Sequence, residues 1–145
     1  MKAETAVQRL VEKHATRNPF EICYNEGIIV ARDPLGDIRG YYRRINTFDY
    51  IAVNSDLEPM AAVFACGHEL AHWVFDKGVN RVFMDYCTHL LPDKLETRAD
   101  RFAAHLLFGQ PPLYQESITT WEMAEILNVP ACNVDARLFD LGIYY

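Results

Sequence analysis

The sequence predicts a single α+β domain, residues 1–145, in which a small, mainly antiparallel sheet precedes a set of helices. Two patterns lead to this prediction. After an opening helical segment, short runs rich in β-branched and aromatic residues alternate with turn residues. The rest of the chain repeats apolar residues at the three- and four-residue spacing of buried helix faces. Half of the 145 residues are hydrophobic, enough for one core, and the chain is too short for two full domains.

The opening segment, residues 3–16, has the apolar spacing of an amphipathic helix, and Asn18-Pro19 ends it. A short helical turn is expected over residues 20–25. The strands follow, and Asn46-Thr47 joins the last two as a hairpin. These three strands are expected over residues 28–31, 38–45 and 48–53.

Two longer helices are predicted in the middle of the chain. The first begins after residues 55–59, which offer polar capping side chains and a proline suited to a first turn. The second begins near Asp93 and ends at Gly109, because Pro111-Pro112 follows. Each helix carries one apolar stripe, so both are expected to lie against the core.

Residues 113–145 are expected to form a helical subdomain that resembles a helix-turn-helix. Its two short helices should span about 119–128 and 131–141, with Val129-Pro130 between them. A helix that reads DNA is basic at its exposed positions, whereas the second of these is neutral to acidic. We therefore expect this subdomain to pack behind the longer helices or to dock a protein, and DNA binding is the weaker alternative.

Charge and composition exclude several classes of protein. The net charge of -6 argues against nucleic acid as the main partner. No apolar run reaches the roughly 20 residues of a membrane span, and the charged N-terminus does not resemble a signal peptide. The four cysteines are scattered without a CxxC pair, so we expect reduced, mostly buried thiols. A cytoplasmic protein is predicted.

The first of the longer helices contains the pentapeptide HExxH at residues 68–72. Residues at i and i+4 share one face of a helix, so the imidazoles of His68 and His72 can reach one cation. Glu69 points round from the core side, where it can take a proton from a water molecule that the metal activates. Alone, the pentapeptide can also occur by chance on a charged helix face.

The second helix offers a third ligand. Zinc catalysis usually needs three protein ligands and one open position. Glu96 and Asp100, in the pattern ExxxD, share one face of this helix. One carboxylate can therefore bind the metal while the other accepts a hydrogen bond from a ligand histidine and fixes its orientation. The alternative for Asp100 is a solvated helix residue.

HExxH followed by ExxxD on the next helix is similar to the thermolysin-like zincins, and the closer resemblance is to the ImmA/IrrE family of small metallopeptidases. The segments that carry this resemblance are Gly27–Val30, Gly40–Tyr42, Ile51–Asn54 and, most clearly, Glu96–Leu107. The resemblance implies a zincin-like fold, His68, His72 and Glu96 as zinc ligands, Glu69 as the base, and Asp100 as the partner of a ligand. Members of the family cleave or inactivate helix-turn-helix repressors of mobile elements or stress operons, so such a repressor is the implied protein partner.

Two positions depart from the family pattern or lie outside it. Arg98 stands where relatives often carry a second acid, which leaves Glu96 as the third ligand. His105 falls off the ligand face and is expected at the surface. Tyr86, His89 and Tyr114 are candidates for stabilising the oxyanion of the tetrahedral intermediate, and the sequence does not choose among them.

The predicted function is thus a zinc-dependent endopeptidase. Manganese is the alternative ion, because two histidines and a glutamate bind several divalent metals. The alternative function is an anti-repressor or antitoxin-like binding module with a structural or degenerate metal site. We favour the enzyme because a binding module has no need for Glu69 beside two ligand histidines.

Overall fold

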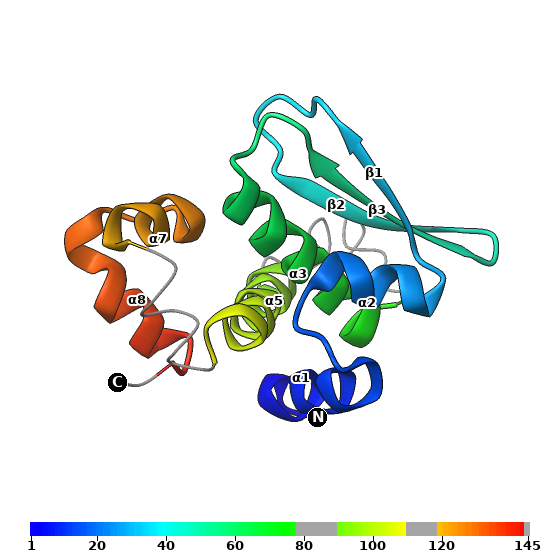
Figure 1. Ribbon diagram of the computed structural model, residues 1–145, viewed down its shortest axis with the longest axis horizontal. Coiled ribbons are helices and arrows are strands. Elements are labelled where there is room, and N and C mark those ends of the chain that lie inside the picture. Colours follow the sequence, from blue (N-terminus) through cyan, green and yellow to red (C-terminus); the bar gives the residue numbers. More distant parts are fainter. Residues whose placement is uncertain (78–89, 110–118, 144–145) are drawn as a thin grey trace.

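The predicted α+β architecture is present in the computed structural model, which describes residues 1–77, 90–109 and 119–143 (Figure 1). Helices and a three-stranded sheet follow one another in the predicted order. Their bounds are α1 Ala3–His14, α2 Pro19–Glu26, β1 Ile29–Asp33, β2 Gly40–Ile45, β3 Phe48–Asn54, α3 Pro59–Phe75, α5 Leu90–Phe108, α7 Thr120–Leu127, the 3-10 turn η1 Ala131–Asn133 and α8 Val134–Asp140.

The sheet is mixed rather than mainly antiparallel, which corrects the prediction. Its strand order is β1-β3-β2, and the predicted β2–β3 hairpin is antiparallel. The other pairing, β1 with β3, is parallel. The cause is burial: β3 is buried along its second half, whereas β1 is largely exposed and β2 buries only Tyr42. The most buried strand takes the centre, so β1 and β2 lie on either side of β3.

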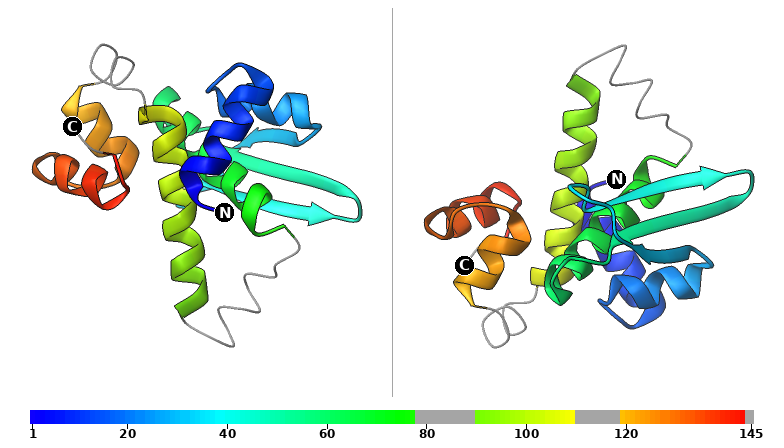
Figure 2. Two further views of the ribbon diagram at one scale, coloured as in Figure 1. Left: turned by 90° about the horizontal axis from the view of Figure 1, so that it is seen from below. Right: turned by 90° about the horizontal axis from the view of Figure 1, so that it is seen from above.

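Helix α3 packs against α5, and Gly67 lies close to Ala103 of α5. A Cβ atom at this position would lie 3.3 Å from the Cβ of Ala103, tighter than usual side-chain packing. Figure 2 shows α3 (green) crossing the long helix α5 (yellow-green). Helix α5 begins at Leu90, about one turn before the predicted start near Asp93, because a proline such as Pro92 is tolerated in a first turn.

Two apolar clusters form the core, and α3 and α5 contribute to both. The first cluster joins these helices to the sheet, α1 and α2. The second joins them to α7 and α8, which buries Met123, Ile126 and Leu138. The C-terminal helices thus pack against the two longer ones (Figure 1), as one of the two predicted roles requires. None of the helices in the described ranges combines the length and apolarity needed to cross a bilayer.

Candidate metal centre

The residues of the HExxH pentapeptide lie together on α3. The Nε2 atoms of His68 and His72 are 3.3 Å apart because one helical turn separates the two residues. His72 is completely buried, and the side chain of His68 is 16% exposed. Glu69 is also buried, and its carboxylate lies within 4.8 Å of ligand atoms of both histidines.

Helix α5 brings Glu96 to the same two nitrogens. Its Oε2 lies 2.8 Å from Nε2 of His68, and its Oε1 lies 3.0 Å from Nε2 of His72. Glu69 follows His68 directly, so it points about 100° away around the helix. Glu96 is therefore the better placed of the two glutamates to share a cation with the histidines.

These three side chains fit a divalent cation such as zinc. Zinc is bound at about 2.0–2.1 Å by histidine nitrogen and at a similar distance by carboxylate oxygen. In a tetrahedral site, two such ligand atoms are about 3.3–3.4 Å apart, and the two Nε2 atoms are separated by 3.3 Å. Two neutral imidazoles with one carboxylate are also a donor set found in catalytic zinc sites.

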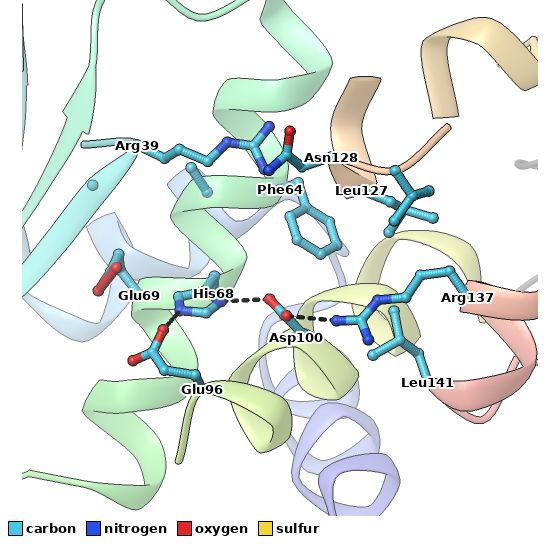
Figure 3. A pocket seen from close by; sticks show the side chains of 13 residues that line it. Arg39, Phe64, His68, Glu69, Glu96, Asp100, Leu127, Asn128, Arg137 and Leu141 are labelled. Atoms are coloured by element: carbon cyan, nitrogen blue, oxygen red, sulfur yellow. Dashed lines mark hydrogen bonds and ion pairs between the residues drawn. The ribbon is translucent and has the colours of Figure 1, made fainter. Parts of the chain in front are cut away.

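Each of the two histidines has its second ring nitrogen held by an aspartate. For His68 the partner is Asp100 on α5, with 2.8 Å between Nδ1 and Oδ1. The other oxygen of Asp100 accepts a hydrogen bond of 2.9 Å from Arg137 on α8 (Figure 3). The carboxylate of Asp100 therefore connects α8 to His68. These two contacts differ from the alternative expectation, in which Asp100 was a solvated helix residue.

The partner of His72 is Asp76, which our sequence analysis missed. Nδ1 of His72 lies 2.9 Å from Oδ2 of Asp76, and the aspartate is buried. Arg98 donates to the other oxygen of Asp76 and lies over the ring of Phe75. The signal was available, because Asp76 follows His72 by four residues and so shares its helix face.

The carboxylates around the histidines shift the pKa values of the metal-free site. Burial lowers the pKa of His68, but hydrogen bonds to Asp100 and Glu96 outweigh it and raise the pKa to about 10. Burial raises the pKa of Glu96, but hydrogen bonds to His68 and His72 outweigh it and hold the pKa below its usual range. A bound cation would replace the proton that these groups share.

A cavity of about 530 Å³ opens beside these residues, between β2 and the C-terminal helices (Figure 3). His68, Glu69 and Glu96 line one side of it. Apolar and basic side chains from α3, α7, α8 and the residues next to α8 and β2 also line it, namely Phe64, Leu127, Leu141, Arg39 and Arg137. Of the two histidines, His68 is the one that borders this cavity.

Gly40 lies beside Glu69 at the edge of this cavity. A Cβ atom on Gly40 would lie 2.7 Å from the carbonyl oxygen of Ala52 and 3.4 Å from Cγ of Glu69. Gly40 begins β2, the edge strand that lines the cavity. The contact with the Ala52 carbonyl oxygen therefore favours glycine at this strand position, and the side chain of Glu69 lies at ordinary contact distance from it.

The remaining candidates fall in different places. Cys66 is completely buried, as predicted, with its sulfur 4.0 Å from that of Cys23.

The prediction that His105 lies at the surface is wrong. Its side chain is only 14% exposed, and its Nε2 lies 3.4 Å from Oε1 of Glu4. The cause is α1, which packs on α5 and covers this position. The oxyanion candidates lie outside the described residues, at positions Tyr86, His89 and Tyr114.

The chain is similar to a known family and to proteins of a bacterium and a phage. The family model described as the IrrE N-terminal-like domain matches residues 23–138. The chain is 30% identical to the Metallopeptidase ImmA of Bacillus subtilis (strain 168), over 95% of this chain and 85% of that protein. It is 32% identical to the "Uncharacterized immunity region protein 2" of Bacillus phage phi105, over 85% of this chain and 78% of that protein.

Proposed function

Because the chain belongs to the ImmA/IrrE family and is a metallopeptidase, we propose that it is a zinc endopeptidase with His68, His72 and Glu96 as ligands and Glu69 as the general base. The observation that carries the proposal is the approach of both Glu96 oxygens to the two Nε2 atoms. Helices α3 and α5 thus supply three side chains, two imidazoles and one carboxylate, of the types that bind zinc. Manganese remains the second choice of ion, because it binds nitrogen and oxygen ligands less tightly than zinc.

The proposed reaction is attack of water on a peptide carbonyl. A bound zinc ion would polarise the carbonyl and make the water more acidic. Glu69 accepts the proton of this water and then delivers it to the nitrogen of the departing amine. Burial beside the cavity suits this role, because it keeps the carboxylate away from bulk solvent and close to the peptide.

The proposed substrate is a helix-turn-helix repressor of a mobile element or a stress operon. A peptidase acts on a protein, and the family resemblance supports a repressor. The phage relative adds support, because its name assigns that protein to an immunity region. A repressor substrate also requires the enzyme to lie in the cytoplasm, the location that the sequence predicts.

The experiment that tests this function compares three forms of the chain on the repressor encoded in its own operon. The wild type should produce a defined fragment, seen by mass spectrometry. Glu69→Gln should slow cleavage by about 10²–10⁴-fold, because the amide cannot accept the proton, while metal content stays unchanged. Glu58→Gln, an exposed glutamate just before the same helix, is the matched control and should cleave normally.

Other outcomes would contradict specific parts of the proposal. Full cleavage by Glu69→Gln would exclude this glutamate as the base. Relief of repression in cells by Glu69→Gln, without a fragment, would favour the non-proteolytic anti-repressor. An intact repressor after incubation with zinc-loaded wild type would exclude this substrate.

A further inference from the structure

We infer that Arg137 on α8 is a positioning residue of the metal centre, which it reaches through Asp100 and His68. The inference rests on the proposed zinc site. It gives the C-terminal helices a part in metal binding, in addition to packing.

The geometry that carries the inference is a chain of two hydrogen bonds. A guanidinium nitrogen of Arg137 lies 2.9 Å from Oδ2 of Asp100, and Oδ1 of the same carboxylate lies 2.8 Å from Nδ1 of His68 (Figure 3). Each oxygen of Asp100 thus has its own donor. Nε2 of His68 is left to face Glu96 and His72.

Arg137 limits the orientations open to Asp100. An aspartate with one donor can rotate about its side-chain bonds and still keep that hydrogen bond, whereas donors on both oxygens select one orientation. The ring of His68 then has a fixed plane and a fixed tautomer, with Nε2 free for a metal. His72 has the equivalent arrangement in Asp76 and Arg98. A histidine, an aspartate and an arginine therefore occur in this order twice at the site.

The two arrangements differ in what holds the arginine. Asp76 directly follows α3, and Arg98 lies on α5. These are the two helices that carry the proposed ligands. Arg137 lies on α8, which is anchored by the completely buried Leu138. The position of α8 therefore determines whether Asp100 has its second donor. A displacement of α8 should loosen His68 and leave His72 unchanged.

The test measures zinc affinity by competition with a chromophoric chelator. Arg137→Met should weaken zinc binding about tenfold, as is typical when the partner of a ligand is lost. Arg137→Lys should recover part of the loss, because it restores one donor and the charge. Arg101→Met is the matched control, because Arg101 donates to the backbone carbonyl of Asp140 on α8 rather than to the carboxylate of Asp100. The zinc affinity of this variant should stay within about twofold of wild type.

A double-mutant cycle separates positioning from general destabilisation. If Arg137 acts through Asp100, Arg137→Met should weaken zinc binding little further in an Asp100→Asn chain. The absorption spectrum of the cobalt-substituted protein provides a second readout, because it responds to ligand geometry. Arg137→Met should change this spectrum, whereas Arg101→Met should not.

Three results would overturn the inference. They are an unchanged zinc affinity and cobalt spectrum in Arg137→Met, equal losses in Arg137→Met and Arg101→Met, or full additivity with Asp100→Asn. If Arg137→Met does not fold, Arg137→Lys carries the same test, and its cobalt spectrum must then differ from wild type. Wild-type protein that takes up no zinc would instead overturn the proposed function, and this inference with it.

Discussion

At the scale of single residues, the candidate site depends on how the two histidines are held. Both present Nε2 to Glu96, and both direct Nδ1 to an aspartate. A ligand whose orientation is already fixed loses little conformational freedom when the metal binds. If the histidines bind a metal as proposed, the aspartates should therefore contribute to its affinity by holding the two imidazoles.

Asp76 provides the first prediction at this scale. Asp76→Asn should weaken zinc binding about 10- to 100-fold, because the amide is a poorer acceptor from His72 and leaves Arg98 without its carboxylate. Chelator competition would measure the loss. Asp135→Asn, at an exposed position on α8, is the control and should bind zinc like the wild type. Equal affinities for the two variants would show that Asp76 has no effect on the site.

The second prediction concerns pH and the metal-free protein. His68 has a pKa of about 10 in the folded chain, against about 6.5 in an unfolded one. The stabilisation from its protonated form is therefore complete below about pH 6.5 and is lost as the pH rises towards 10. Urea unfolding with a chelator present should show a free energy of unfolding that falls between about pH 6.5 and pH 9. Asp100→Asn should flatten this dependence, and a wild-type stability that rises over the same range would contradict the assignment.

The sequence predicts only part of the site, for physical reasons. His68, Glu69 and His72 follow from local helix geometry, and Glu96 and Asp100 follow from the same spacing on a second helix. Asp76 obeys this spacing too and could have been found. Arg137 could not, because its contact with Asp100 joins residues 37 positions apart and depends on how α8 packs.

At the scale of elements, the distance between α3 and α5 decides whether Glu96 can meet the two histidines. Gly67 and Ala103 allow the helices to approach closely, one residue before His68. Any side chain that separates the helices here would also move Glu96 away from the histidines. The small residues at this crossing should therefore matter for the proposed metal site as well as for the core.

Gly67→Val tests this coupling. The added methyl groups would contact Ala103 closer than ordinary packing allows, so we expect a loss of about 1–3 kcal/mol in the free energy of unfolding. Zinc affinity should fall as well, because Glu96 shifts with α5. Ala136→Val, an exposed position on α8, controls for the cost of a β-branched residue in a helix. If zinc affinity is unchanged in a destabilised Gly67→Val chain, the crossing does not set the site.

Strand positions follow from the sequence, but strand partners do not. The predicted strands agree with β1, β2 and β3 to within about two residues. Alternation of apolar residues shows which face of a strand is buried, and it carries no information about the neighbouring strand. The parallel β1–β3 pairing therefore emerged only from the structure.

At the scale of the whole molecule, the cavity lies between two packed units that share α3 and α5. The sheet edge at β2 bounds one side of it, and α7 and α8 bound the other. Arg39, just before β2, crosses to donate to the carbonyls of Glu125 and Ile126 on α7. The C-terminal helical subdomain should therefore be needed both for stability and for the shape of the cavity.

Leu138→Ala measures this dependence. Leu138 is completely buried on α8, so truncation should lower the free energy of unfolding by about 2–5 kcal/mol. Phe139→Ala removes an exposed side chain from the next position and should cost much less. Thermal or urea unfolding of both variants gives the comparison. Equal, small losses would mean that α8 is not firmly packed on the rest of the chain.

The central claim is that His68, His72 and Glu96 together hold a zinc ion. Inductively coupled plasma mass spectrometry on protein purified without chelator tests it most directly, with wild type and Glu96→Ala side by side. We predict about one zinc per wild-type chain, and loss or strong weakening of binding in the folded variant. Wild-type protein without metal even after zinc is added, or equal zinc in the two proteins, would contradict the three-ligand site.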